Sequence, residues 1–131
     1  MRLHELRNKK ISSLSFKDKL IGSRKELINH AQHLYDTWHG TDGSGLCRNI
    51  AYDFAYILKD KFWNVDSAEV KLRGDQYGVE HYWVVVTDNK NESYKIDIPY
   101  QIYEEGNTRK GFLKKPNVVF TENDVQIEKL S

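Results

Sequence analysis

The stretch YWVVVTDNKNESYKIDI, residues 82–98, carries the strongest structural signal in this chain of 131 residues. Its first five residues are aromatic or β-branched, which favours a strand, and its last five alternate between apolar and polar. The polar run DNKN at 88–91 is typical of a turn, and Pro99 predicts the end of the second strand. The stretch therefore predicts an antiparallel β-hairpin.

The loop length of this hairpin decides which side chains share a face of the sheet. A three-residue loop at 88–90 predicts that His81 lies directly opposite Asp97. A two-residue loop would instead place the two side chains on opposite faces. Because a carboxylate beside an imidazole fixes its tautomer and favours its charged form, the first register predicts a candidate site for chemistry.

Helical periodicity dominates the residues before the hairpin. The run SRKE at 23–26 resembles a capping box with Ser23 as N-cap, and the apolar stripe after it predicts a helix over about 24–38. Three glycines within residues 40–45 predict a loop. A second amphipathic helix is expected over about 46–61, capped by Ser44 or Gly45, with this buried stripe: Cys47, Ile50, Ala51, Phe54, Ile57 and Leu58, with Phe62 beyond.

The rest of the chain gives weaker signals. They predict a loosely held arm or short helix at 1–15, a strand at 67–73, a turn at 74–78, and a hairpin from 117–121 and 124–129. The length fits one domain spanning residues 1–131. We therefore expect an α+β fold in which N-terminal helices precede an antiparallel sheet and the second helix packs on that sheet.

Composition limits the possible classes of function. The formal net charge is +1, which argues against a nucleic-acid-binding protein, and the basic segments at 7–10 and 109–115 are read as solvated surface. A single cysteine excludes an internal disulfide and a structural thiolate zinc site. With no apolar run of membrane-spanning length and no secretory signal, we expect a cytoplasmic protein without a membrane contact.

Cys47 is a candidate nucleophile because it lies in the first turn of the second predicted helix. Amide groups and the helix dipole at such a position stabilise a thiolate, and the Cys47 N–H can serve as an oxyanion donor. His81 then manages the proton and Asp97 orients the imidazole. Each residue also has a structural interpretation: a core cysteine, a histidine bonded to backbone, and an aspartate that forms a turn.

Two other kinds of site are disfavoured. His30, His33 and His39 lack the spacing and the carboxylates of a catalytic zinc shell, so no metal is expected. Cys47 cannot belong to a C-x5-R phosphatase motif, because position 53 is Asp.

Three blocks of the sequence resemble the transglutaminase-like superfamily of cysteine enzymes. They are GLCRNIA at 45–51, HYWVVV at 81–86 and YKIDIP at 94–99. The resemblance implies a papain-like fold, a nucleophile at Cys47, a base at His81 and an orienting acid at Asp97, with no cofactor. The chain lacks the glutamine that papain relatives place upstream of the cysteine, so Trp38 or Gln32 is considered as a second oxyanion donor.

The resemblance constrains mechanism better than reaction, because the superfamily contains peptidases, deamidases, amidases and transglutaminases. We predict a hydrolase or acyltransferase that forms a thioester on a protein or peptide substrate, with water as the favoured acceptor. Gly45, Leu46, Arg48 and Trp83 are the predicted substrate-binding residues. A small effector delivered into a host cell is one expectation, and a non-catalytic binding or inhibitor protein on the same scaffold is the alternative. Oligomeric state is left open.

Overall fold

The computed structural model describes residues 15–38, 45–62, 65–74, 80–108 and 111–130. Its helices are α2 (Phe16–Gly22), α3 (Arg24–Thr37), α4 (Leu46–Lys61) and α5 (Tyr100–Tyr103), with a 3-10 turn, η1, at Glu122–Asp124. Its strands are β1 (Val65–Gly74), β2 (Glu80–Asp88), β3 (Ser93–Asp97), β4 (Glu104–Thr108), β5 (Gly111–Lys114) and β6 (Gln126–Lys129). The predicted arm at 1–15 and the predicted loops at 40–45 and 74–78 lie almost wholly outside the described residues.

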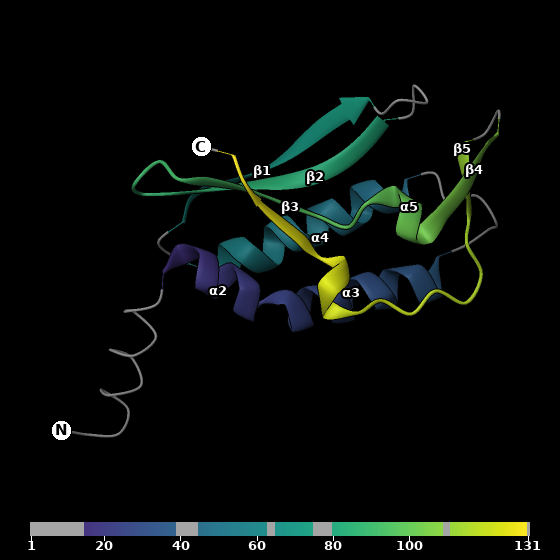
Figure 1. Cartoon of the computed structure of the whole chain (residues 1–131), viewed down its shortest axis with the longest axis horizontal. Helices are drawn as coiled ribbons and strands as arrows, with labels where there is room; N and C mark the ends of the chain where they lie inside the picture. The colour runs from purple at the N-terminus through teal and green to yellow at the C-terminus, as the bar shows by residue number, and fades with distance from the viewer. Residues whose placement is uncertain (1–14, 39–44, 63–64, 75–79, 109–110, 131) are drawn as a thin grey trace, which may run out of the picture.

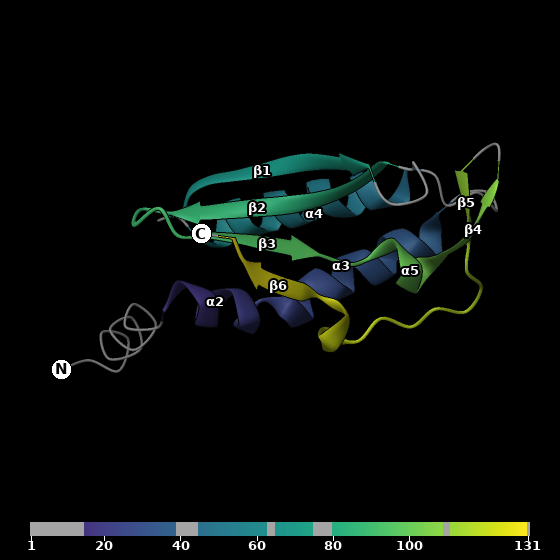
Figure 2. The ribbon, with the colours of Figure 1, turned by 45° about the horizontal axis from the view of Figure 1, so that its top comes forward.

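The large sheet is antiparallel, with the strand order β1-β2-β3-β6, and β4 pairs with β5 in a separate two-stranded sheet. Helices α3 and α4 lie together along one face of the large sheet (Figures 1 and 2). Two layers of this kind bury the apolar stripe of each helix and one face of the sheet in a shared core. The expected α+β class is therefore confirmed.

Helix α4 provides the centre of that core. It covers the predicted range of 46–61, and all of these stripe residues are buried: Cys47, Ile50, Ala51, Phe54, Ile57, Leu58 and Phe62. From the sheet, Val84, Val86 and Ile96 are fully buried in the same cluster. The 3.6-residue period in 46–61 and the β-branched run in β2 thus fix the two sides of one interface.

The start of α3 differs from the predicted capping box. Ser23 is the N-cap residue, but its side chain does not cap α3; its hydroxyl donates to the Lys19 carbonyl at 3.0 Å. The reason is the preceding helix α2, which the sequence analysis missed and which ends next to Ser23. Ser23 has helical backbone angles, so its hydroxyl bonds back to the preceding turn as a serine inside a helix does.

The register of the β2–β3 hairpin also differs from the prediction. Val84 pairs with Ile96 and Thr87 with Ser93, so the strands are shifted by two residues relative to a loop at 88–90. The Asp88 carboxylate accepts from the backbone N–H groups of Lys90 and Glu92, and the Asp88 N–H donates to the Glu92 carbonyl. The loop is therefore three residues long, as expected, but it lies at 89–91, one residue later than predicted. If this pairing continues to the end of β3, Trp83 rather than His81 lies opposite Asp97. Because side chains alternate between the two faces of a sheet, a shift of two residues still leaves His81 and Asp97 on the same face.

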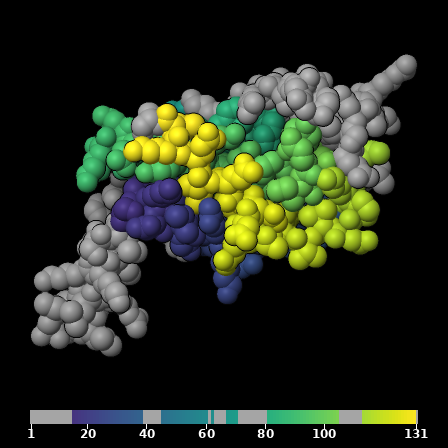
Figure 3. All heavy atoms as spheres, viewed as in Figure 1, coloured from purple at the N-terminus to yellow at the C-terminus, as the bar shows by residue number. Residues whose placement is uncertain are grey.

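The predicted C-terminal hairpin is wrong. Residues 118–121 form no strand, and β6 pairs with β3 instead. The C-terminal segment lies against α2 and α3 on one surface of the molecule (Figure 3). The Gln32 side chain takes the place of a partner strand: its Nε2 donates to the Val118 carbonyl at 3.1 Å and its Oε1 accepts from the Phe120 N–H at 2.8 Å.

This side-chain clamp leads to a stability prediction. Gln32→Ala should lower the free energy of unfolding by about 2 kcal/mol, because two half-buried backbone groups lose their partners. Urea titration of the variant measures the change. Asp36→Ala removes only the exposed contact of the same amide and should cost less than about 0.5 kcal/mol. Equal losses in both variants would contradict the clamp.

Candidate active site

The three predicted catalytic residues lie at one end of the molecule. The first turn of α4, the first residues of β2 and the last residue of β3 meet there, next to α5 (Figure 2). Cys47 is the second residue of α4, His81 the second of β2 and Asp97 the last of β3. The chain therefore brings three side chains together from segments 34 and 16 residues apart in sequence.

His81 and Asp97 form a buried pair. The His81 Nε2 lies 2.8 Å from the Asp97 Oδ1, and the two side chains are 9% and 6% exposed. The hairpin register makes them diagonal rather than direct neighbours, and a diagonal pair on one face is within reach of long side chains. The prediction that His81 and Asp97 are adjacent is confirmed, although the predicted register that led to it is not.

The pKa of His81 is raised from 6.5 to about 9. Burial of the ring lowers the pKa, but the hydrogen bond to Asp97, the interaction with the Cys47 side chain and the charges of both groups outweigh burial. At neutral pH the imidazole is therefore protonated. The protonated ring can therefore act as an acid toward a group that reacts at the Cys47 sulfur.

The second nitrogen of the His81 ring, Nδ1, is the one left for proton exchange with Cys47. Because Nε2 is bonded to Asp97, proton exchange with the sulfur falls to Nδ1, which is buried and has no hydrogen bond to any described residue. The sulfur interacts with His81 strongly enough to raise the pKa of the imidazole. In this arrangement Asp97 holds Nε2 of the His81 ring, and Nδ1 is free to donate or accept a proton.

The space around Cys47 is tight. The residue is 8% exposed, and a small enclosed gap joins it to side chains of α4, β2, β3 and α5, with no room for a water molecule. The lining includes Phe54, Tyr82, Trp83, Asp97 and Tyr103. The described residues thus present a closed site, in which a substrate carbonyl reaches the sulfur only after side chains move.

Two tyrosines of α5 belong to this site and were missed by the sequence analysis. Tyr103 is 1% exposed and lines the same gap as Cys47, and the Tyr100 ring meets His81 edge-on at 6.0 Å. Burial, followed by the nearby charges of Cys47, Glu104 and Asp97, holds the pKa of Tyr103 well above its usual value, so its hydroxyl stays protonated. The only sign of these two residues in the sequence is that two tyrosines, three positions apart, follow directly after Pro99.

The predicted substrate-binding residues occupy different environments. Leu46 is fully buried in the core, so its side chain cannot contact a substrate. Arg48 is exposed on α4, and Gly45 is half-buried at the helix start. Trp83 is half-buried, with its ring 6.5 Å from the His81 ring and the Lys95 ammonium 5.0 Å above it.

Gly45 is the N-cap of α4 and has a left-handed backbone with φ of 87°. A Cβ at this position would meet the Trp38 ring at 3.7 Å, which is an ordinary contact, so the conformation rather than space requires glycine. Gly45→Ala should therefore destabilise the protein by about 1–2 kcal/mol in urea unfolding. Gly22→Ala is the matched control, because Gly22 has no positive φ and no atom within 4 Å of the added methyl; it should be neutral or stabilising.

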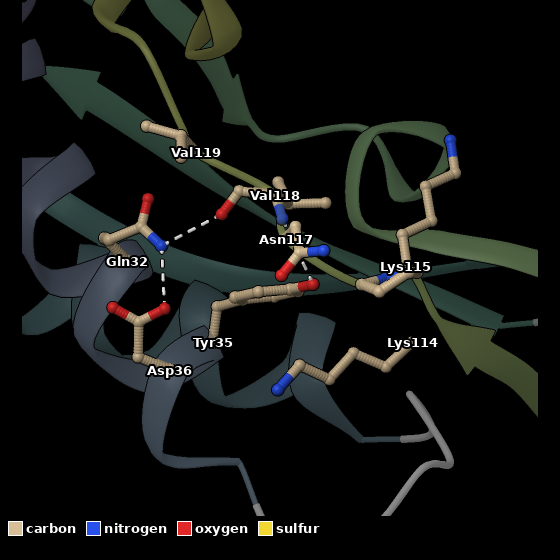
Figure 4. Close-up of a pocket in the computed structure, with 9 residues that line it drawn as sticks. Gln32, Tyr35, Asp36, Lys114, Lys115, Asn117, Val118 and Val119 are labelled. Carbon is tan, nitrogen blue, oxygen red and sulfur yellow. Dashed lines mark hydrogen bonds between the residues drawn. The ribbon is translucent and has the colours of Figure 1, made fainter.

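Of the two side chains considered as a second oxyanion donor, Gln32 and Trp38, only Trp38 lies near the start of α4. Gln32 is occupied by the C-terminal segment, as described above, and lies in an open groove of about 770 Å³ between α3 and residues 114–119 (Figure 4). That groove does not include Cys47, and its Lys114 ammonium lies 4.2 Å from the Tyr35 ring centre. Gln32 is therefore excluded as a donor, whereas Trp38 lies against Gly45 at the start of α4.

No metal centre is found among the described residues. The His30 Nδ1 lies 3.6 Å from the Asp53 Oδ2, which links α3 to α4 at the surface, and His33 is exposed. His39 lies outside the described residues. Within the same part of the chain, no helix combines the length and apolar character needed to cross a bilayer.

In comparisons with known proteins, no family model, no curated protein and no solved structure matches this chain.

Proposed function

We propose that the chain is a cysteine-dependent enzyme of acyl transfer, with Cys47 as nucleophile, His81 as proton carrier and Asp97 as the group that orients His81. The proposal includes the papain-like, transglutaminase-like character of the fold. The observation that carries it is the buried His81–Asp97 pair at 2.8 Å, beside a cysteine in the first turn of a helix. A buried histidine with a purely structural role would have both ring nitrogens hydrogen-bonded, whereas the His81 Nδ1 has no hydrogen-bond partner among the described residues.

The reaction follows from these protonation states. The Cys47 thiolate attacks a substrate carbonyl, whose oxygen becomes negative and accepts from the Cys47 backbone N–H. The His81 imidazolium then gives its Nδ1 proton to the leaving amine, and a thioester remains on Cys47. Neutral His81 next takes a proton from water, and the resulting hydroxide attacks the thioester to release a carboxylic acid and restore the thiolate and imidazolium.

The substrate we propose is a protein or peptide, with water as the favoured acceptor, so that the activity is that of a peptidase or deamidase. A role as a small effector in the cytoplasm of a host cell remains part of the proposal. Trp83, half-buried with its ring 6.5 Å from the His81 ring, is the side chain that we expect to contact such a substrate.

One observation favours a second candidate, a non-catalytic binding or inhibitor protein on the same scaffold. Cys47 is only 8% exposed, and the gap beside it has no room for water. A thiol that stays enclosed in this way would act as a small core residue.

Alkylation of Cys47 by iodoacetamide separates the two candidates. An enzyme of the proposed kind should react rapidly without denaturant, and His81→Ala should slow the reaction strongly, because the imidazole activates the sulfur. An enclosed core thiol should react slowly unless urea is added. Mass spectrometry of the modified peptide gives the rate, and slow labelling that only unfolding accelerates would overturn the proposed activity.

A further inference from the structure

The outer face of α4 carries an ordered row of exposed side chains. Arg48, Tyr52, Tyr56 and Asp60 are spaced four residues apart, and all four are exposed. Tyr52 and Tyr56 are 53% and 75% exposed, whereas most apolar residues of the same helix are buried. Within the described part of the chain, neither Arg48 nor Asp60 forms an ion pair.

Helix stability does not account for the two tyrosines. Tyrosine is a poorer helix former than alanine, glutamate or lysine, so it gains nothing at a solvated position. Tyrosine and arginine are, in contrast, enriched where protein surfaces meet. The other large apolar residues that are exposed lie singly on other elements: Ile21, Leu113, Val119 and Leu130.

The row is complementary to itself. If two antiparallel α4 helices cross at about 50°, the angle at which two rows spaced by four residues pack along each other, about a twofold axis midway between Tyr52 and Tyr56, Arg48 of each copy faces Asp60 of the other. Tyr52 of each copy then faces Tyr56 of the other. The row spans 12 residues, about 18 Å of helix, and its opposite charges lie at equal distances from the axis. A parallel arrangement would place like charges together.

We propose that a second copy of this chain docks on this row, so that the protein forms a homodimer with a twofold α4–α4 interface. Twofold dimers are the commonest oligomers, and a twofold interface requires a self-complementary surface of this kind. The inference does not depend on catalysis, because it holds equally for an enzyme and for a binding protein. It places Asp60 of the second copy near the helix start that carries Cys47.

The expected dimer is weak. A contact between two single helices buries less surface than the roughly 1,200–2,000 Å² of stable complexes. We therefore expect dimers at protein concentrations of roughly 0.1–1 mM and monomers at low micromolar concentration.

Sedimentation equilibrium of the full chain tests the interface. Arg48→Asp and Asp60→Arg each create two repulsive contacts in a homodimer, and each should weaken dimerisation at least about tenfold. An equimolar mixture of the two variants should dimerise at least as well as the original chain, because both contacts in the mixed dimer join opposite charges. A chain that carries both Arg48→Asp and Asp60→Arg should also dimerise, because its two contacts again join opposite charges. Tyr56→Ser should not dimerise, because it removes an aromatic ring from the centre of the row.

Lys129→Asp on β6 is the control, since it changes an exposed charge away from α4 and should leave dimerisation unaltered. Circular dichroism verifies that each variant is folded. A chain that stays monomeric at 1 mM, or a mixture that dimerises no better than its two components, would overturn the proposal.

Discussion

We expect His81→Ala to slow the acylation of Cys47 by p-nitrophenyl acetate about 10²–10⁴-fold at pH 7. The imidazole that exchanges a proton with Cys47 is lost, and Asp97, which lines the same gap as Cys47, is left without the ring that it orients. Tyr103, which shares the gap with Cys47, keeps its proton because its pKa lies well above the usual value. Release of p-nitrophenol in a burst equal to the enzyme concentration measures the step directly.

His30→Ala provides the matched control for this experiment. His30 is half exposed and pairs with Asp53 on the surface of α4, so its removal changes the same residue type without touching the site. Its acylation rate should equal that of the original chain. Equal rates in His30→Ala and His81→Ala, with both proteins folded, would show that Cys47 reacts as an ordinary thiol.

The elements that build the site could be predicted because each has a local cause. The apolar stripe from Cys47 to Leu58 recurs with the helical period, and only one side of α4 can then face a core. The alternation in β2 and β3 fixes which residues share a face even when the pairing is shifted by two. This tolerance is why His81 and Asp97 were correctly placed together from an incorrect register.

Other features depend on contacts between distant residues and leave no local pattern. The segment at 118–121 carries β-branched residues, yet its backbone binds a single side chain, Gln32, and β6 pairs with β3 instead. Helix α5 has only four residues, too few for periodicity to reveal. The closure of the site around Cys47 likewise arises from how Tyr103 and Trp83 pack, which no motif encodes.

The second large effect concerns stability. Asp97→Asn should lower the free energy of unfolding by about 3 kcal/mol at pH 6, because the buried imidazolium of His81 loses the charge that stabilises it. In the folded original chain the pKa of His81 is about 9, against 6.5 for an ordinary histidine. Since the folded pKa is the higher one, this stabilisation is fully present below about pH 6.5 and is lost as the pH rises through about 9.

The cost of Asp97→Asn should therefore shrink to below about 1 kcal/mol by pH 10, where a neutral imidazole can still donate to the amide oxygen of asparagine. Urea titrations of both proteins at half-unit steps from pH 6 to pH 10 measure the difference. Cys47 is another ionisable side chain that interacts with His81, so the same two proteins should also be compared after Cys47→Ala has been introduced into both. If the loss of unfolding free energy caused by Asp97→Asn stays constant from pH 6 to pH 10 in both backgrounds, His81 is neutral throughout this range. The ring could then not supply the proton that the proposed reaction passes to the leaving amine.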